Sequence, residues 1–306
     1  ASYNLQSTFS GYSFYDPAST PWVIGAILAV LVGYCLMGGG KRIMKVTSTL
    51  VPFMGGIYVL VALIVVVLHI QLLPQVLGRI FSEAFDFQAI FAGFTGSAMM
   101  YGIKRGLFSN EAGVGSAPNA AASAHVSHPA KQGLVQMLSV FIDTLLICAA
   151  TAFMLLCSGV EPTKGLEGAP YVQAALQNVF GAAGPVFITV AMVLFAFTTL
   201  IGNLYYVDNA LNYIVGRVPS REFMVLFHIN AMIVIFIGAG QSIDLVWNLA
   251  DVLMGLMALI NLPVILILAR PALDAMKDYS AQRKAGKNPV FKAKDIGLEG
   301  KTEYWQ

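Results

Sequence analysis

Charged residues are scarce in this sequence. Asp, Glu, Lys and Arg make up 11% of the 306 residues, whereas hydrophobic residues make up 57%. Because an average soluble domain carries about 25% charged residues, the composition excludes an ordinary water-soluble domain and predicts an integral membrane protein. The net charge of +2 does not indicate a nucleic-acid-binding protein, since the basic residues do not gather on one soluble face.

Cysteine and histidine are also rare, and neither forms a recognisable site. The three cysteines, Cys35, Cys148 and Cys157, lie in apolar runs, where cysteine behaves as a small hydrophobic residue. The four histidines lack the spacing typical of metal ligands. The sequence also lacks a Ser/His/Asp arrangement and a phosphate-binding loop. We therefore expect no enzyme activity, no metal site and no cofactor.

Long apolar segments are the main feature that is present. A helix needs about 20 mostly apolar residues to span a bilayer, and seven segments qualify. We expect an all-α membrane protein with about seven transmembrane helices in residues 21–269, preceded by a polar lead-in at 1–20. The predicted spans are residues 21–38, 46–70, 88–126, 133–157, 183–206, 222–239 and 243–269. Two shorter stretches, 71–86 and 163–180, are expected to form helices along the membrane surface.

Basic residues are distributed unevenly between the two sets of segment ends. Most of the 18 Lys and Arg residues follow the first, third, fifth and last segments, whereas only Arg79 and Lys164 lie at the opposite ends. Because cytoplasmic loops carry an excess of Lys and Arg, we expect residues 1–20 outside and residues 270–306 as a cytoplasmic tail, in the plasma membrane (the inner membrane of the cell). We expect the last helix to end at Arg270-Pro271 and residues 277–306 to be partly disordered.

The third segment is interrupted by a polar, glycine-rich stretch, residues 106–119. At membrane depth, irregular backbone survives only around a cavity, and an ionisable residue such as Glu111 indicates a functional site. A broken helix offers free N–H groups and free carbonyl groups, which suit a carboxylate and a small cation respectively. We expect Ser116 to cap the second half and Pro118 to lie in its first turn. The alternative is a re-entrant loop in which Glu111 is structural and bonded to nearby amides.

Other polar side chains lie inside the predicted spans. Thr198 and Thr199 could offer hydroxyl oxygens to a hard cation such as Na⁺, or each could bond to a carbonyl one turn earlier. Asp143 must be paired, protonated or exposed to a polar cavity, which leaves both a structural hydrogen bond and proton coupling open. Lys104 and Arg105 are expected to reach an aqueous vestibule rather than to bind a carboxylate.

The last span contains further polar residues. Asp251 raises the same question as a carboxylate in any membrane helix. Asn261 lies beside Pro263, and we expect its side chain to satisfy a backbone group that the proline leaves free.

Residues 106–121, GLFSNEAGVGSAPNAA, resemble the signature of the alanine/glycine:cation symporter family, that is, the sodium:alanine symporter family. The resemblance covers most of residues 34–265. Further similar motifs lie in residues 40–54, 128–144 and 250–262. One departure is Asn119, where family members more often carry an apolar residue.

This resemblance implies a LeuT-like fold of two inverted five-helix repeats with a discontinuous helix at the glycine-rich stretch. The chain would contain the last two helices of the first repeat and the whole second repeat. It would lack the first three core helices and would be incomplete alone.

The resemblance also implies secondary active transport of a small neutral amino acid, alanine or glycine, by alternating access, with Na⁺ or in some members H⁺ as the coupling ion. Gly113 and Gly115 would let the backbone approach the amino acid closely. Thr198 and Thr199 would bind the cation, and Asp143 is a candidate coupling residue. The candidate substrate-binding residues are Ser109, Asn110, Glu111, Gly113, Gly115 and Ser116.

Other classes of membrane protein also have seven spans with an outside start. A retinal protein needs a lysine in its last helix, and residues 243–269 contain none. A channel would need oligomeric pore rings, which the sequence does not indicate. Transport is therefore the expected function, and a seven-helix receptor or channel-like protein without solute coupling is the alternative.

Overall fold

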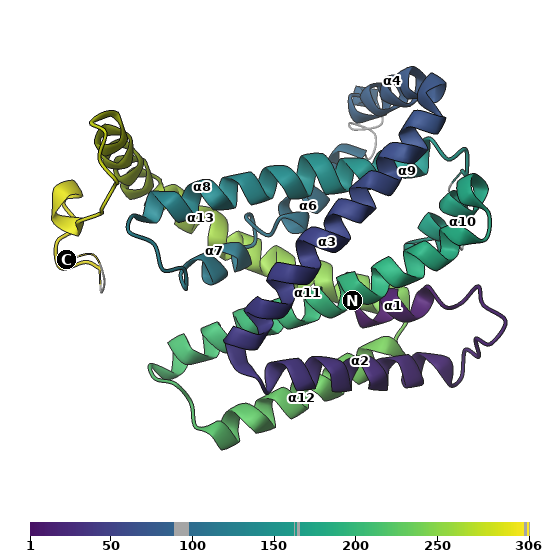
Figure 1. The fold of residues 1–306 in the computed structure, drawn as a ribbon, viewed down its shortest axis with the longest axis horizontal. Helices are drawn as coiled ribbons and strands as arrows, with labels where there is room; N and C mark the ends of the chain where they lie inside the picture. Colours follow the sequence, from purple (N-terminus) through teal and green to yellow (C-terminus); the bar gives the residue numbers. More distant parts are fainter. Residues whose placement is uncertain (89–97, 162, 164–165, 303–304, 306) are drawn as a thin grey trace. The chain divides into compact units, whose positions relative to one another are not determined.

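The protein is described by a computed structural model that covers residues 1–88, 98–161, 163, 166–302 and 305 (Figure 1). The described residues form helices and no strand. They fall into two compact units. The first unit comprises residues 1–100 and 145–250, and the second comprises residues 101–144 and 251–306.

The first unit contains most of the helices. They are α1 (Ser2–Ser7), α2 (Thr20–Leu36), α3 (Gly39–Leu68), η1 (Ile70–Leu72), α4 (Leu73–Ala84), α9 (Ala149–Leu156), α10 (Ala169–Phe180), α11 (Ala183–Val215) and α12 (Arg221–Ala239). The short stretches predicted at 71–86 and 163–180 thus contain the helices α4 and α10.

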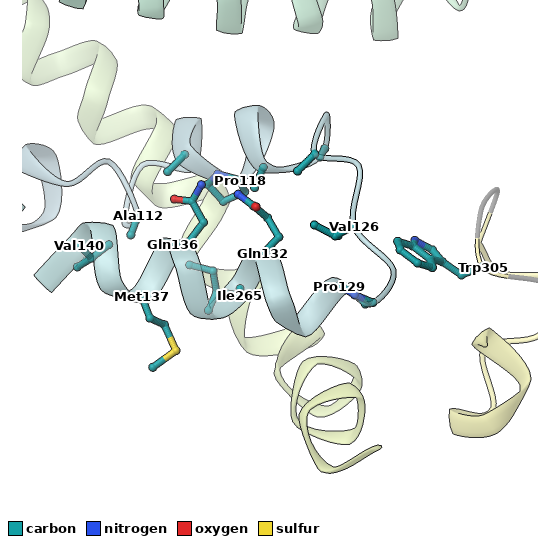
Figure 2. Close-up of a pocket in the computed structure, with 15 residues that line it drawn as sticks. Ala112, Pro118, Val126, Pro129, Gln132, Gln136, Met137, Val140, Ile265 and Trp305 are labelled. Carbon is teal, nitrogen blue, oxygen red and sulfur yellow. The ribbon is translucent and has the colours of Figure 1, made fainter. Parts of the chain in front are cut away.

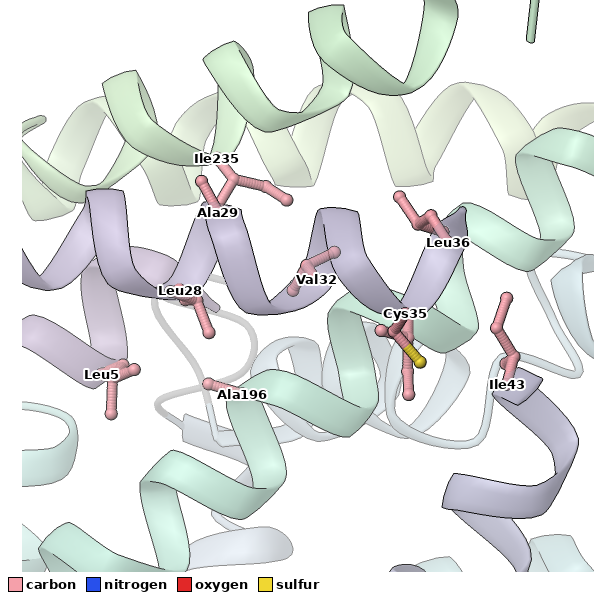
Figure 3. Packing of buried hydrophobic residues seen from close by; sticks show 10 residues of the cluster. Leu5, Leu28, Ala29, Val32, Cys35, Leu36, Ile43, Ala196 and Ile235 are labelled. Carbon is pink, nitrogen blue, oxygen red and sulfur yellow. The ribbon is translucent and has the colours of Figure 1, made fainter. Parts of the chain in front are cut away.

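Two clusters of buried side chains hold the first unit together. One cluster joins α1, α2, α3, α11 and α12 and includes the buried Val32 and Leu36 of α2 (Figure 3). The other joins α3, α9, α10 and α11 around Met154 and Leu176. Small residues allow the helices to approach each other, as is usual in membrane proteins. A Cβ atom at Gly25 of α2 would lie only 2.7 Å from the Cβ atom of Ala239 in α12.

Several helices are suited to a bilayer. Among the described residues, five helical stretches are long and apolar enough to cross one, and α2 is a shorter apolar helix of 17 residues. The five are Gly39–Leu68, Pro129–Leu156, Ala183–Val215, Arg221–Ala239 and Ile243–Lys284. The prediction of an all-α, multi-pass membrane protein is therefore confirmed. The predicted third span falls partly on residues 89–97, outside the described residues, so the number of seven crossings stays a prediction.

The second unit is built from α6 (Ala98–Ser109), α7 (Ser116–Ala121), α8 (Pro129–Phe141) and the larger part of α13 (Ile243–Lys284). A π-helix, η3 (Ile142–Cys148), connects α8 to α9. Helix α13 does not end at Arg270-Pro271, and that prediction is wrong: the helix runs through Pro271 to Lys284. The residues after Pro271 include Ala, Leu, Met, Lys and Gln, which are strong helix formers, so one missing N–H donor does not stop the helix.

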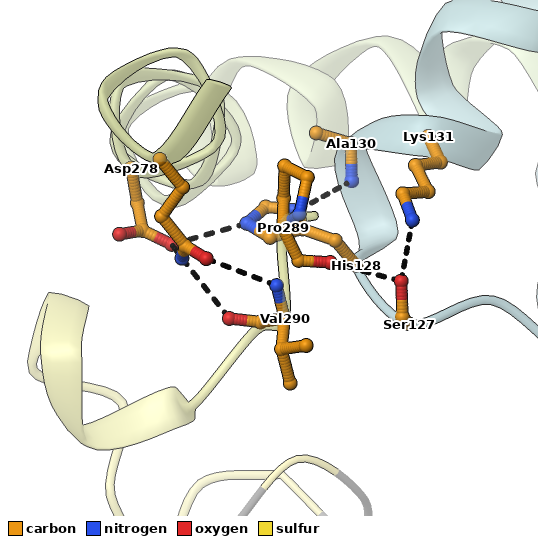
Figure 4. A network of polar contacts seen from close by, with 8 residues as sticks. Ser127, His128, Ala130, Lys131, Asp278, Pro289 and Val290 are labelled. Carbon is orange, nitrogen blue, oxygen red and sulfur yellow. Dashed lines mark hydrogen bonds and ion pairs between the residues drawn. The ribbon is translucent and has the colours of Figure 1, made fainter. Parts of the chain in front are cut away.

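Residues 277–302 are folded where we expected partial disorder. Residues 288–291 pack against residues 127–131 at the start of α8, and we call this contact the tail clasp (Figure 4). The Phe291 N–H donates to the Ser127 carbonyl oxygen at 3.0 Å, and Ser127 Oγ donates to the Pro289 carbonyl oxygen at 2.9 Å. The expectation of disorder overlooked these partners, which lie more than 150 positions away in the sequence.

A buried histidine lies at the centre of the tail clasp. His128 is fully buried, and its Nε2 atom lies 3.1 Å from Asp278 Oδ2. The rings of Tyr279 and Phe291 meet the imidazole edge to face at centroid distances of 5.2 and 5.1 Å. A polar ring this deeply buried needs such a partner, so the carboxylate of α13 fixes the corner that begins α8.

Candidate functional site

The helix of the third predicted span is interrupted where the sequence places the glycine-rich stretch. Helix α6 ends at Ser109, the chain turns through residues 110–115, and α7 begins at Ser116. Asn110 Oδ1 accepts the Ala112 N–H at 3.1 Å, a side-chain bond that favours a turn over a helix. We call residues 110–115 the break.

Two residues of the break have left-handed backbone conformations. Gly115 has φ +93°, which glycine adopts without steric cost. Glu111 has φ +58°, which is uncommon for a residue with a Cβ atom. Its carboxylate accepts a hydrogen bond of 2.6 Å from Ser116 Oγ, and its carbonyl accepts the Gly115 N–H at 3.0 Å. The break is therefore closed on itself by two bonds to Glu111.

The predicted capping role of Ser116 is wrong. The N-cap residue of α7 is Gly115, which makes no side-chain cap, and Ser116 is the first helical residue. Because the left-handed Gly115 already turns the chain into the helix, the Ser116 hydroxyl is directed to Glu111 instead. Pro118 lies in the first turn of α7, as predicted.

The end of α6 is bonded to the π-helix. Ser109 Oγ donates to Asp143 Oδ2 at 2.7 Å, and Asn110 Nδ2 donates to Thr144 Oγ1 at 3.1 Å. A π-helix widens one turn of an α-helix and often occurs at functional sites. Asp143 thus has a hydrogen-bond partner inside the second unit, which is one of the outcomes left open by the sequence. Thr144, which directly follows Asp143, takes part in the same connection.

A side chain of α13 reaches the inner part of the break. Asn261 Nδ2 lies 3.0 Å from both the Ala112 and the Gly113 carbonyl oxygens. The expectation that Asn261 would serve its own helix beside Pro263 is therefore wrong: it serves backbone groups of the break. Gly115 explains why this fits, because a Cβ atom there would lie 2.7 Å from Asn261 Cγ and Oδ1.

Three charged residues form a second connection between α6 and α13. Lys104 Nζ and Arg105 Nη1 both pair with the carboxylate of Asp251, the latter at 2.9 Å. The Asp251 side chain is 17% exposed, and a carboxylate so buried needs a cationic partner. We had expected the two cations to extend to a vestibule, whereas they satisfy this carboxylate.

The break contains backbone donors that remain available. The Gly113 and Val114 N–H groups have no hydrogen-bond partner among the described residues, although both residues are buried. Buried N–H groups without a partner are rare in proteins. They are therefore candidates for binding an anionic group.

A cavity of about 770 Å³ lies beside the second half of the broken helix. Small and apolar side chains of α7, α8 and the segment between them form most of its wall, and Gln132 and Gln136 of α8 supply amide groups (Figure 2). Ala112 of the break is part of the wall.

The threonine pair lies in α11, in the first unit. Thr198 is buried, and its hydroxyl donates to the Leu194 carbonyl oxygen at 2.8 Å, which is the bonding one turn back that we considered as the alternative. The hydroxyl of Thr199 is exposed and has no partner in the described part of the chain. Also in this unit, Asp208 of α11 pairs with the buried His228 of α12 at 3.0 Å, a contact that the sequence did not indicate.

In the described part of the chain, five helical stretches suited to a bilayer define a multi-pass membrane protein, and the polar break between α6 and α7 is its candidate site. Residues 2–293 match the sodium:alanine symporter family, and the chain belongs to this family. The family and the relatives described next are transporters and not enzymes.

Relatives from bacteria and an archaeon share much of the sequence. The chain is 45% identical to the amino-acid carrier protein AlsT of Bacillus subtilis (strain 168), over 93% of this chain and 60% of AlsT. It is 37% identical to the sodium/proton-dependent alanine carrier protein of Bacillus sp. (strain PS3), over 99% of this chain and 71% of that protein. It is 38% identical to the sodium/alanine symporter AgcS of Methanococcus maripaludis, over 86% of this chain and 58% of AgcS. The chain thus spans about three fifths of the length of AlsT and AgcS.

Proposed function

We propose that the whole protein to which this chain belongs is a secondary active transporter that couples uptake of a small neutral amino acid, alanine or glycine, to Na⁺ by alternating access. Membership of the symporter family supports this proposal. The names of two relatives, a sodium/alanine symporter and a sodium/proton-dependent alanine carrier, support alanine and Na⁺, and the second keeps H⁺ open as a coupling ion.

The single observation that carries the site is the break with its two available N–H groups. An amino acid has a carboxylate, and the Gly113 and Val114 N–H groups are donors of the kind that bind it. The glycine at 113 leaves little bulk around these donors, which favours a small side chain on the substrate. Ser109, Asn110, Glu111, Gly115 and Ser116 complete the proposed substrate site as the residues that form or brace the break.

We assign the cation to the threonine pair of α11. The exposed Thr199 hydroxyl is the more available ligand, because the Thr198 hydroxyl already donates to the Leu194 carbonyl. A hydroxyl that donates a proton keeps a lone pair for Na⁺, so Thr198 is compatible with the same role. Asp143 is the candidate for proton coupling.

The proposed architecture is the LeuT-like inverted repeat with seven crossings in this chain. The proposed orientation places residues 1–20 outside and residues 270–306 in the cytoplasm of the cell, in the plasma membrane. The excess of Lys and Arg at one set of helix ends supports this orientation.

Uptake of labelled alanine into proteoliposomes that contain the full-length protein tests the proposal. We expect concentrative uptake when a Na⁺ gradient points inward and competition by unlabelled glycine. In Thr199→Ala, the Na⁺ concentration for half-maximal uptake should rise several-fold, whereas Thr199→Ser should retain the wild-type value. Uptake that is equally strong without Na⁺ and without a proton gradient would contradict coupling and would favour the channel-like alternative.

A further inference from the structure

Asn261 makes contacts with the break that its own helix does not require. Its side chain comes from α13, and its Nδ2 atom donates to the carbonyl oxygens of Ala112 and Gly113, at 3.0 Å each. Carbonyl oxygens only accept hydrogen bonds, so only the amide nitrogen can face this pair. The side chain also packs against Gly115, where no Cβ atom would fit. The break is thus shaped around this one amide.

The geometry of the peptide bond turns this contact into a constraint on the donors of the break. In a trans peptide the C=O and N–H groups point in opposite directions, and the unit is planar. The peptides concerned join Ala112 to Gly113 and Gly113 to Val114. When Asn261 holds both carbonyl oxygens, the N–H groups of Gly113 and Val114 must both point away from Asn261. These are the two donors without a partner among the described residues.

We propose that Asn261 is a positioning residue of the transport site, which aims the Gly113 and Val114 N–H groups at the substrate carboxylate. This inference rests on the proposed function, because it assigns the carboxylate of the amino acid to that N–H pair. Asn261 does not touch the substrate. It fixes two peptide planes before the substrate arrives, and such preorganisation lowers the cost of binding.

The ion pair of Asp251 makes the direction of the two N–H groups depend on the position of α13 relative to α6. Asp251 pairs with Lys104 and Arg105, which lie on the same α6 helix that leads into the break. Helix α13 is therefore attached to α6 at Asp251 and to the break at Asn261. A displacement of α13 relative to α6 would release the carbonyl groups and reorient the N–H pair, which would lower affinity for the carboxylate.

The variant Asn261→Asp tests this role with almost no change in shape. At pH 8 the introduced carboxylate has no proton to donate and repels the two carbonyl oxygens. We expect the KM for alanine to rise about tenfold, since two hydrogen bonds are lost, while the maximal rate changes less than about twofold. At pH 5.5 a larger fraction of the introduced carboxyl is protonated than at pH 8 and can donate one hydrogen bond, so the KM should move part of the way back toward the wild-type value.

A specificity measurement separates positioning from general loosening of the fold. Wild-type protein should prefer alanine to alaninamide, which has no carboxylate, as a competitor for labelled alanine uptake. In Asn261→Asp at pH 8 this preference should fall about tenfold together with the affinity for alanine. A loosened fold would weaken both competitors alike. The same purified variant measured at pH 5.5 is a control for folding, because a partial return of the KM shows that the protein is still folded.

Asn178→Asp is the matched control. Asn178 Nδ2 also donates to a backbone carbonyl, that of Ser158, at 2.7 Å, but it lies on α10 in the first unit. We expect this variant to retain the wild-type KM and competitor preference at both pH values. The charged groups on α6, the break, η3 and the part of α13 that contacts them include Glu111, Asp143, Asp251, Lys104 and Arg105. They are unchanged in the variant, so each pH value is compared with wild-type protein at that pH.

Hydrogen exchange separates failure of this inference from failure of the proposed function. Amide exchange in residues 108–118, measured by mass spectrometry in detergent, should be faster in Asn261→Asp than in wild-type protein at pH 8 and unchanged in Asn178→Asp. Wild-type KM, wild-type competitor preference and unchanged exchange in Asn261→Asp would overturn the positioning role while transport stands. Absence of any coupled uptake by wild-type protein would overturn the proposed function, and the exchange result would still decide whether Asn261 fixes the break.

Discussion

Glu111 is the residue on which the shape of the break depends most directly. Its left-handed backbone, with φ +58°, costs on the order of 1–3 kcal/mol for a residue that is not glycine. The bond from Ser116 Oγ to its carboxylate, at 2.6 Å, contributes about 1.5–3 kcal/mol, as is typical of hydrogen bonds to charged groups. The two magnitudes are similar, so the hydroxyl of Ser116 offsets the strain at Glu111.

Removal of that hydroxyl should destabilise the second unit. In Ser116→Ala the Glu111 carboxylate loses its side-chain partner, and we expect a loss of about 1–3 kcal/mol. For a protein of this size each kcal/mol corresponds to about 2–4 °C in Tm, so thermal unfolding in detergent should show a decrease of several degrees. Ser116→Thr keeps the hydroxyl and should retain the wild-type Tm. If Ser116→Ala had the same Tm as wild-type protein, a group other than the Ser116 hydroxyl would stabilise the turn at Glu111.

At the scale of elements, the end of α6 is bonded to η3 in register. Consecutive residues of α6 and the break, Ser109 and Asn110, donate to consecutive residues of the π-helix, Asp143 and Thr144. The wider turn of a π-helix displaces side chains from the spacing of an α-helix. Here two adjacent side chains of η3 are both placed to receive hydrogen bonds from the broken helix.

A variant that removes the charge of Asp143 but keeps the shape of its side chain can decide the role of this residue. Asp143→Asn keeps an oxygen that accepts from Ser109 Oγ, so a purely structural role predicts Na⁺-driven alanine uptake within about twofold of wild type. Proton coupling at this carboxyl predicts instead that uptake in Asp143→Asn no longer responds to a proton gradient. Asp143→Leu removes the acceptor, leaves the Ser109 hydroxyl without this partner, and should lower uptake in either case. The measurement is initial uptake rate under imposed Na⁺ and proton gradients.

The elements of the chain were largely predictable, because apolar runs and glycine-rich interruptions are local features of a sequence. The position of the break followed from the residues around Glu111, which disfavour a continuous helix. The end of α13 was not predicted correctly from the sequence, because the helix formers after Pro271 continue the helix. The N-cap of α7 was also wrong, since glycine in a left-handed conformation and serine at the next position compete for the same role.

The contacts that brace the break were beyond prediction from the sequence. Asn261 bonds to residues about 150 positions earlier, and Asp143 bonds to a residue 34 positions earlier. Both side chains were recognised as polar residues in a span that need a partner. Their partners depend on the packing of α13 and η3 against the broken helix, for which a single sequence has no local signal.

At the scale of the whole second unit, one helix connects the parts of the candidate site. Helix α13 contacts residues 101–144 through Asp251, Asn261 and Asp278, which are spread over about 40 Å of helix at 1.5 Å per residue. The first two contacts lie beside the break, and the third belongs to the tail clasp. Because one continuous helix makes all three contacts, the tail clasp and the break are connected through α13.

The tail clasp should therefore resist local opening more than an exposed tail would. Gln282 Nε2 donates to the Val290 carbonyl oxygen at 3.0 Å and to Asp278 Oδ2 at 2.8 Å, and its Oε1 accepts the Val290 N–H at 3.0 Å. In Gln282→Ala these three bonds are lost, and we expect trypsin to cleave after Lys287 about five- to tenfold faster, because proteolysis follows the local opening equilibrium. Mass spectrometry of the fragments measures the rate.

Asp274→Asn is the control: it removes only the exposed pair with Lys277, which contributes about 0–1 kcal/mol, and should leave the cleavage rate unchanged. Equal rates in Gln282→Ala and wild-type protein would show that the contacts with Ser127, His128 and Lys131 hold residues 288–291 without Gln282.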